Sequence, residues 1–486
     1  MITFFIALAL LIVGYFVYGK FIEHVFHPDE RATPCVAHPD GVDFCPITKW
    51  RAFLIQLLNI AGLGPIFGAL SGAIWGPSVY LWIVFGTIFA GGVHDYLSGM
   101  LSLRNNGASI AEITGKYLGN GMKQVMRVFS VILLVMVGIV FMVGSAGILA
   151  GMTGLSKTLW VIIVLLYFFC ATLLPIDKLI GRLYPIFGIC LIVMAIGVGG
   201  GTILRAINDP ANHPMIELTF QNLRDDGLSM WPFMFVTVAC GAISGFHATQ
   251  SPLVARCVTS EKEGRQIFYG AMVAEGIIAL IWASAGIAFY YNKDAAVGSI
   301  TANLLAIGGG NSTSVMEISK GLLGPIGGVL AVLGVVACPI TSGDTAFRSA
   351  RLTIADWFHI DQASIQKRLA LTLPLLLVGY LVSFVDYSII WRYFSWSNQT
   401  LAMIALWAGA VYLCQKKNNF WVAAVPATFM SAVSVTYFLM APEIYIKLAS
   451  YIAYPIGIII ALAFLGIFWF RVVVPNKSKD VQVKYS

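Results

Sequence analysis

Charged residues are scarce in this chain of 486 residues. Asp, Glu, Lys and Arg make up 11% of it, whereas 58% of the residues are hydrophobic and the mean hydropathy is +0.83. Soluble domains carry about 25% charged residues, so the composition excludes an ordinary soluble protein. The apolar residues form continuous runs of about 20 residues, long enough to cross a bilayer as helices, and they do not alternate as strands of a membrane barrel do. The sequence therefore predicts an all-α polytopic membrane protein.

The N-terminal apolar run lacks the marks of a cleaved signal peptide. No Lys or Arg precedes Lys20, and no small-residue cleavage site follows the run. We therefore expect a retained anchor helix over residues 2–20. The net charge of +7 requires no nucleic-acid partner, because loops that face anionic lipid headgroups are basic.

Thirteen apolar runs are candidates for transmembrane helices, and they cover residues 2–20, 50–76, 78–103, 124–150, 157–175, 183–207, 230–255, 266–291, 322–346, 369–386, 388–414, 420–440 and 448–471. Lys and Arg are divided unequally between the alternate connections. The set that begins with the loop after the first run and ends with the C-terminal tail holds 23 of them, and the other set holds 7. Because basic loops stay in the cytoplasm, we expect the N-terminus outside and the C-terminus inside.

The second run is interrupted at its centre by Gly62, Leu63, Gly64 and Pro65. Proline removes a helical hydrogen-bond donor, and glycine lowers helix propensity. In lipid, an opened backbone is tolerated only where it lines a cavity or is buried in protein. We interpret this run as a broken helix whose freed amides could bind a carboxylate and whose freed carbonyls could bind a cation. A plain proline kink is the structural alternative.

The seventh run contains a second interruption, in which Ser244, Gly245 and His247 join glycine to polar groups at membrane depth. It lies five runs after the first, and an odd number of spans makes successive units point oppositely across the membrane. We therefore predict two inverted five-helix repeats, at 50–229 and 230–419. An anchor helix and loop at 1–49 precede them, and two peripheral helices and a tail at 420–486 follow. Substrate would bind between the two broken helices.

Ionisable side chains within the runs are candidates for carrying a coupling proton. His94 and Asp95 lie in the third run, and Glu275 lies near the middle of the eighth. Ionisable residues at membrane depth are expensive and mark functional sites by default. The structural alternative is a hydrogen-bonded His–Asp pair that fixes helix register.

The end of the ninth run offers a second candidate ion site. Thr341, Ser342 and Asp344 supply hydroxyl and carboxylate oxygens within about one turn. Such hard oxygen donors suit Na⁺ or a proton. Arg348 lies four residues after Asp344, so a local ion pair is the alternative.

The loop before the second run collects potential metal ligands, namely His27, Cys35, His38 and Cys45. Sulfur and imidazole ligands of this kind suit a structural Zn²⁺. The spacing matches no standard zinc finger, and free thiols are the alternative. A Cys35–Cys45 disulfide would require the opposite orientation, because the cytoplasm is reducing.

Several of these motifs occur together in one known family. The sequence resembles the short form of the carbon starvation protein CstA family of bacterial inner-membrane transporters. The resemblance extends over roughly residues 10–415 and rests on IAGLGPIFG at 60–68, GGVHD at 91–95, NGASIAEI at 106–113, ACGAISGFHATQSP at 239–252, AEG at 274–276 and TSGDTAFRSARLTIADW at 341–357.

The resemblance implies import of small carbon sources under nutrient limitation, with peptides or pyruvate as substrates and protons as the coupling ion. It implies a LeuT-like fold with a core of five plus five inverted helices. It also implies that the ninth-run oxygens lie where related sodium-coupled transporters hold a cation. The family often reads Ser-Gly-Thr after Gly-Phe-His, whereas this chain has Ala248, Thr249 and Gln250, a difference that bears on substrate preference.

Three classes of function are therefore considered: a secondary transporter, a haem-binding redox subunit, and a channel or intramembrane enzyme, of which a channel would conduct without saturation. A secondary transporter would hold the carboxylate of pyruvate at the amides near Leu63 and contact its keto oxygen through His247 or Ser244; sodium-coupled uptake of amino acids or peptides is a variant. A haem-binding redox subunit would need paired histidines as axial ligands, and only His94 and His247 lie within the runs. No nucleophile–base arrangement typical of an enzyme stands out.

Overall fold

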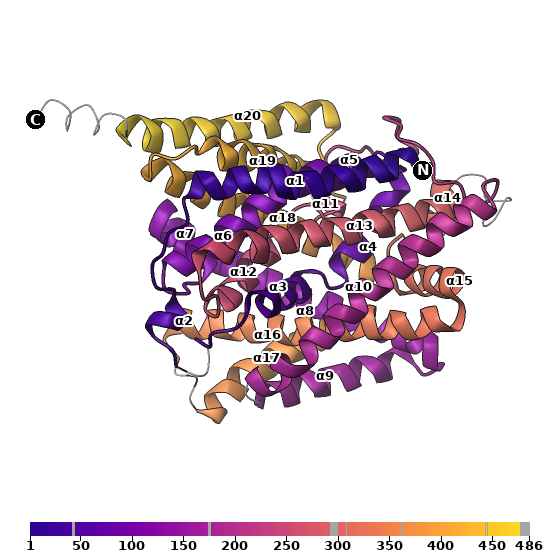
Figure 1. Cartoon of the computed structure of the whole chain (residues 1–486), viewed down its shortest axis with the longest axis horizontal. Coiled ribbons are helices and arrows are strands. Elements are labelled where there is room, and N and C mark those ends of the chain that lie inside the picture. Colours follow the sequence, from indigo (N-terminus) through magenta and orange to yellow (C-terminus); the bar gives the residue numbers. More distant parts are fainter. Residues whose placement is uncertain are drawn as a thin grey trace, which may run out of the picture.

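The architecture was analysed in a computed structural model of the chain (Figure 1). It describes residues 1–40, 44–173, 176–291, 300–307, 309–360, 362, 364–442, 444 and 446–476. Within these ranges every regular element is a helix, as the composition predicts.

The helices of the first half are α1 (Ile2–Phe26), α2 (Pro34–Ala37), α3 (Lys49–Ile60), α4 (Gly64–Gly72), α5 (Val79–Leu81), a π-helix at Trp82–Gly91, α6 (Gly92–Arg104), α7 (Ile110–Leu118), α8 (Asn120–Thr153), α9 (Lys157–Leu173) and α10 (Ile176–Asn208). The second half contains α11 (Phe233–Thr237), α12 (Gly245–Ala255), a short helix at Glu261–Glu263, π-helical turns at Arg265–Tyr269, α13 (Gly270–Phe289), α14 (Ile300–Ala306), α15 (Ser312–Leu330), α16 (Ala337–Phe358), α17 (Ile365–Val382), α18 (Tyr387–Gln415), α19 (Trp421–Met440) and α20 (Ser450–Phe468).

Among the described residues, seven helices are long and apolar enough to cross a membrane, or up to nine if each of two bent helix pairs counts as one span. The chain is thus a multi-pass membrane protein, while the predicted number of thirteen spans is not confirmed. The difference arises because several apolar runs are divided into shorter helices. The third run, for example, is built from α5, the π-helix and α6.

The ninth apolar run, predicted as a span at 322–346, contains a sharp bend. The segments Ser312–Val329 and Gly334–Phe358 meet at an angle of 93° within that run. Gly324, which precedes Pro325, adopts a positive φ of 60° inside α15, a conformation that glycine tolerates and other residues rarely adopt. Hydropathy alone does not register such a turn, since the residues on both sides remain apolar.

The interrupted helices lie inside the bundle. Helix α4 packs against α13, and α12 packs against α6, α3 and α18, while the long helix α8 packs against both α16 and α18. Figure 1 shows α19 and α20 along one edge of the molecule and α9 along the opposite edge. The ends of the two broken helices are therefore enclosed by α6, α8, α13 and α18.

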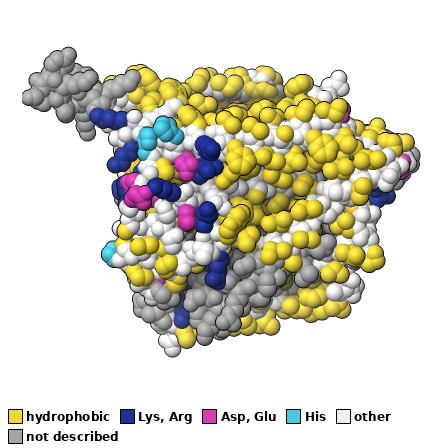
Figure 2. Space-filling view, viewed as in Figure 1, with side chains coloured by type: hydrophobic (Ala, Val, Ile, Leu, Met, Phe, Trp, Pro, Cys, Tyr) yellow, Lys and Arg dark blue, Asp and Glu magenta, His cyan; other side chains and the backbone are white. Residues whose placement is uncertain are grey.

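Charged side chains are concentrated at one end of the molecule. Figure 2 shows blue and magenta side chains gathered near the end where α2 and α7 lie, whereas the adjoining flank is mainly hydrophobic. Exposed apolar side chains run along helices such as α1, α9 and α20. A broad apolar flank between polar ends is the surface expected of a protein embedded in lipid.

Candidate coupling and substrate site

The first predicted break is present. Helix α3 ends at Ile60, α4 begins at Gly64, and the two segments are bent by 50°. A Cβ atom on Gly64 would lie 2.4 Å from the Cys240 sulfur, and one on Gly62 would lie 2.8 Å from the Phe141 ring. A side chain at Gly64 would displace Cys240 and one at Gly62 would require the Phe141 ring to shift, so both positions favour glycine.

The second predicted break is also present, between the end of α11 at Thr237 and the start of α12 at Gly245. Gly241 in this connection has a φ of +90°, which favours glycine. The contact of Gly64 with Cys240 places the first break directly against the second. The two interrupted segments therefore meet, as the substrate-site hypothesis requires.

Asn398 of α18 fixes the second break. Its side-chain oxygen accepts hydrogen bonds from the Phe246 backbone N–H at 2.7 Å and from the Ser244 hydroxyl at 3.1 Å. The side chain is fully buried, so it replaces the intrahelical partner that the first turn of α12 lacks. Asparagine in a long apolar helix has no distinctive sequence signal, and this residue was not predicted.

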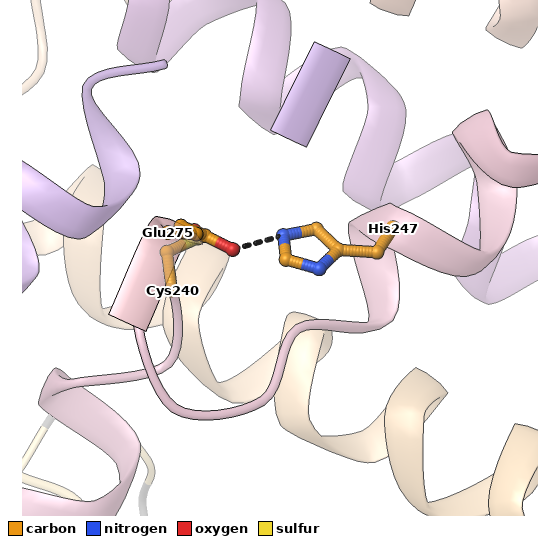
Figure 3. Close-up of side chains that lie close together, drawn as sticks. All are labelled: Cys240, His247 and Glu275. Atoms are coloured by element: carbon orange, nitrogen blue, oxygen red, sulfur yellow. Dashed lines mark ion pairs between the residues drawn. The ribbon is translucent and has the colours of Figure 1, made fainter. Parts of the chain in front are cut away.

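Three ionisable residues from three different helices converge beside the second break. Asp95 Oδ2 lies 2.8 Å from His247 Nδ1, and His247 Nε2 lies 3.3 Å from Glu275 Oε2. Figure 3 shows the His247 ring directed toward the Glu275 carboxylate, with Cys240 next to it. His94 Nδ1 binds the other Asp95 oxygen at 2.7 Å. All four ionisable side chains are buried.

We refer to Asp95, His247 and Glu275 as the coupling cluster. Both nitrogens of His247 face carboxylate oxygens, but a neutral imidazole has only one N–H. Nδ1 is engaged by Asp95, while Nε2 lies 3.3 Å from Glu275 Oε2 without forming a hydrogen bond, so one added proton would be shared between Nε2 and Glu275. A second added proton would neutralise the cluster. An arrangement with room for one more proton in low dielectric is typical of a proton-binding site.

Cys240, His247 and Glu275 also have the donor atoms of a metal site. Among the described residues they are the one group of three or more His, Cys, Asp and Glu side chains whose ligand atoms lie within 4.8 Å of one another. His247 Nδ1 already contacts Asp95 and its Nε2 faces Glu275, so both imidazole nitrogens have protein groups beside them. The contact of His94 and His247 with Asp95 likewise accounts for both histidines without a haem.

The predicted oxygen cluster of the ninth run lies elsewhere. Ser342 donates a hydrogen bond to the Leu58 carbonyl at 3.1 Å, near the end of α3. The Thr345 hydroxyl bonds back to the carbonyls of Thr341 and Ser342. Asp344 lies 3.3 Å from Arg348, the local pair that the spacing predicts. These residues approach the first break rather than the coupling cluster.

The four potential zinc ligands are not brought together as a group of three or more among the described residues. The buried Cys35 thiol instead donates to the Val258 carbonyl at 3.1 Å. His27 ends α1 in a left-handed conformation, its ring 5.1 Å from that of His24. His38 is exposed and Cys45 is half-buried. Bound zinc stays a prediction.

A network at the α2 and α7 end was not predicted. Arg104 at the end of α6 donates to both carboxylate oxygens of buried Glu261, at 2.9 and 2.7 Å. The same guanidinium donates to the Tyr412 hydroxyl at 2.5 Å and to the His27 carbonyl at 2.8 Å. The Asp29 N–H also donates to Glu261, at 3.0 Å. This Arg104–Glu261 clamp ties together α1, α6, α18 and the segment before α13.

Sequence relatives match between 62% and 87% of the chain. A protein of Haemophilus influenzae described only as an uncharacterized membrane protein is 42% identical, over 62% of this chain and 95% of its own. The peptide transporter CstA of Bacillus subtilis is 26% identical over 87% of both chains. The pyruvate/proton symporter BtsT of Escherichia coli is 25% identical over 68% of this chain and 56% of its own.

Solved transporters share the fold. The crystal structure of MhsT in complex with L-phenylalanine matches 86% of this chain and 99% of its own with a TM-score of 0.57 at 15% identity. The inward-facing conformation of Mhp1 matches 94% of this chain and 96% of its own with a TM-score of 0.53 at 14% identity. At such identities the likeness supports the LeuT-like fold alone.

The family profile described as "Carbon starvation protein CstA" matches residues 1–149, 122–307 and 291–437. These three matches overlap and together reach from the anchor helix α1 into α19. They include both broken helices and every residue of the coupling cluster. The chain therefore belongs to the carbon starvation protein CstA family of membrane transporters.

Proposed function

We propose that the chain imports small carboxylates, pyruvate or short peptides, by proton-coupled alternating access. The observation that carries this proposal is the coupling cluster, in which three buried ionisable side chains from α6, α12 and α13 meet beside the second break. A static structural role would need only a matched pair of charges. Two carboxylates on one imidazole leave one negative charge that a proton can neutralise.

The cluster is positioned to link proton binding to helix movement. His247 lies in the first turn of α12, Cys240 lies before it, and Gly64 at the start of α4 contacts Cys240. A proton that alters the bonds of His247 would therefore act on both broken helices. Substrate would bind at Leu63, Gly64 and Ser244, where helix ends present backbone N–H groups.

The names of relatives favour this assignment of substrate and ion. The Bacillus subtilis relative is named a peptide transporter, and the Escherichia coli relative a pyruvate/proton symporter. By the distribution of basic residues, the N-terminus would face outward and the tail inward in a bacterial cytoplasmic membrane. A role under carbon starvation is part of the proposal.

Uptake by the purified full chain in proteoliposomes tests the proposal. We expect an inward proton gradient to drive accumulation of labelled pyruvate or of labelled dialanine, and Glu275→Gln to abolish that accumulation. Glu112→Gln is the matched control, because Glu112 forms exposed ion pairs with Lys123 and Arg127. Proton-driven uptake at the wild-type rate in Glu275→Gln would contradict the role of the cluster.

Sodium-coupled uptake of an amino acid or peptide is the second candidate. The contact of Ser342 with the Leu58 carbonyl favours it, because it places a hydroxyl oxygen beside a carbonyl at the end of α3. Oxygen atoms from a hydroxyl and a carbonyl are suitable ligands for a hard cation. A sodium gradient that drives uptake at equal pH, and loses its effect in Ser342→Ala, would favour sodium over protons.

A further inference from the structure

Cys240, His247 and Glu275 bring three kinds of metal-ligating atom together inside the bundle. Their ligand atoms lie within 4.8 Å of one another, and none of the three residues is more than 2% exposed. Figure 3 shows the His247 ring directed at the Glu275 carboxylate, with the Cys240 side chain beside that carboxylate. Thiolate sulfur, imidazole nitrogen and carboxylate oxygen are the ligands that Zn²⁺ takes in proteins. We refer to these three residues as the ligand triad.

The facing atoms of His247 and Glu275 form no hydrogen bond. His247 Nε2 and both carboxylate oxygens of Glu275 are buried, and none of them has a hydrogen-bond partner among the described residues. His247 Nδ1 lies 2.8 Å from the Asp95 carboxylate. An ionised carboxylate only accepts, so Nδ1 carries the hydrogen of a neutral ring. Nε2 therefore presents a lone pair to Glu275 Oε2 at 3.3 Å, and two buried electron-pair donors in this position require a cation between them.

The spacing of these atoms suits a metal ion as that cation. Nitrogen and oxygen ligands bound tetrahedrally to Zn²⁺ at about 2.0–2.1 Å lie about 3.4 Å apart. The distance between Nε2 and Oε2 is 3.3 Å. The Cys240 sulfur lies within 4.8 Å of both atoms, and it would approach them by up to about 1.2 Å to bind at the usual zinc–sulfur distance.

Neighbouring side chains orient two of the three ligands in the way that metal sites require. A metal-binding histidine usually donates its other ring N–H to a carboxylate. Asp95 occupies that position beside His247, and His94 Nδ1 holds Asp95 in turn at 2.7 Å. The Asn398 side-chain amide donates to the Cys240 sulfur at 3.6 Å. A donor directed at sulfur stabilises the thiolate, which is the form that binds metal.

We propose that the ligand triad binds a soft divalent cation of the Zn²⁺ class and that this cation arrests transport. Binding releases the Cys240 thiol proton, so one thiolate and one carboxylate balance the charge of the dication. Cys240 precedes α12, His247 lies in its first turn, and Glu275 lies on α13. The metal therefore fixes both sides of the second break to α13. The arrest of transport rests on the proposed function, whereas the metal site does not.

Cadmium binding to the purified full chain tests the site, because a bond between Cd²⁺ and sulfur produces an ultraviolet charge-transfer band. We expect one equivalent of Cd²⁺ per chain to produce this band and Cys240→Ser to remove it. Cys414→Ser, at a buried cysteine of α18, is the matched control and should keep the band. Glu275→Gln should weaken cadmium binding by about 100-fold or more, since loss of an outer-shell partner alone weakens metal binding by about 10–100-fold.

Two further measurements assign the band. The double variant Cys35→Ser, Cys45→Ser should keep it, because those cysteines belong to the loop before α3. Cadmium should raise the midpoint of thermal unfolding of the wild-type protein and of Cys414→Ser, but not of Cys240→Ser. A band that persists in Cys240→Ser or disappears in the double variant would overturn the inference, as would an equal rise of the midpoint in Cys240→Ser and wild type.

Uptake in proteoliposomes separates the metal site from the proposed function. Cadmium should stop proton-driven uptake by the wild-type protein, and Cys240→Ser should raise the half-inhibitory concentration by about 100-fold. Uptake that continues at its full rate while the band is present would overturn the arrest of transport. A band that depends on Cys240 in a protein that transports neither pyruvate nor dialanine would sustain the metal site and overturn the proposed function.

Discussion

The two ends of the molecule are closed to different degrees. At the end that holds Met1, which would face outward in the proposed orientation and is called the outer end, a cavity of about 640 Å³ reaches the end of α11. At the opposite end, which would face inward and is called the inner end, the cavity lined by Ser109, Thr249 and Asp356 measures about 210 Å³. There the Arg104–Glu261 clamp joins α6 to α1 and α18. The two ends differ in how they are held. Tyr387 and Trp391 line the larger cavity, whereas the ion pair of Arg104 with buried Glu261 holds the inner end together.

This difference indicates how alternating access would proceed. Aromatic contacts are non-directional and can re-form after a shift of the helices. Separating the partners of a buried ion pair costs free energy, because each partner is left as an uncompensated charge. Opening the inner end would therefore require separation of Arg104 from Glu261, while closing the outer end would require only that α4 and α11 move toward α8 and α18.

Asp95→Asn is expected to have the largest effect, because Asp95 holds the coupling cluster together. Asp95 binds both histidines, and loss of a buried charge partner should lower proton-driven uptake by about 100-fold or more. Initial rates in proteoliposomes measure the change. Asp226→Asn serves as the control, since its pair with Arg224 lies at the surface. Equal rates in the two variants would mean that Asp95 has a structural role only.

Glu261→Gln should open the end that the Arg104–Glu261 clamp closes and close the opposite end. Loss of the clamp should favour the inward-open state and raise the rate at which a thiol reagent labels Thr249→Cys by about 10-fold, equivalent to about 1.4 kcal/mol in the balance of states. Labelling of Ser388→Cys at the outer end should fall in the same protein. In the control Glu30→Gln, the affected pair with Lys262 is exposed and should contribute little. Parallel changes at both ends would argue against alternating closure.

Gly245→Ala tests the close contact between the start of α12 and helix α18. A Cβ atom there would lie 2.4 Å from the Asn398 carbonyl oxygen and 2.6 Å from the Ala402 nitrogen, both backbone atoms of α18. Overpacking of this kind costs about 1–3 kcal/mol, so we expect a lower midpoint of thermal unfolding. Gly200→Ala has nothing within 4 Å and should be unchanged. A normal midpoint for Gly245→Ala would show that α12 and α18 can separate without loss of stability.

The smallest effect concerns the ion pair between the Met1 ammonium and Glu217, which holds the start of α1. The Met1 ammonium and the Thr3 hydroxyl hold the pKa of Glu217 down at about 2. The stabilisation is therefore complete above the ordinary value of 4.5 and is lost as the pH falls toward 2. Because Glu217 is exposed, Glu217→Gln should lower the unfolding midpoint at neutral pH by less than about 2 °C. The difference between variant and wild type should vanish near pH 2; a difference that persists there would exclude this ion pair as its cause.

Much of the central site could be predicted from the sequence because its residue types are unusual within a membrane-spanning helix. Glycine and proline in the middle of the second and seventh apolar runs predicted breaks that the structure contains. His94, Asp95, His247 and Glu275 stood out as ionisable residues in apolar surroundings, and the fold brings them together. The family resemblance implied the LeuT-like fold that the solved transporters share, whereas span counting did not establish the number of spans.

The parts that escaped prediction depend on contacts between distant segments. Asn398 and Glu261 have ordinary sequence neighbours, and their roles follow only from partners about 150 residues away. The hydroxyls of Thr341 and Ser342 were grouped with the ionisable residues by chemistry, but the packing of α16 places Ser342 beside α3. The bend in the ninth run escaped detection because hydropathy is insensitive to direction.

One imidazole between two acids would also set the electrical character of each proton-coupled transport cycle. With its shared proton, the group formed by Asp95, His247 and Glu275 carries one negative charge, and a further proton brings it to zero. A monovalent anion that binds together with that proton leaves the net charge of the transporter unchanged. Uptake of one anion with one proton would be driven by the pH difference across the bilayer and would not depend on the membrane potential. A cell without a membrane potential could therefore still import substrate through this protein.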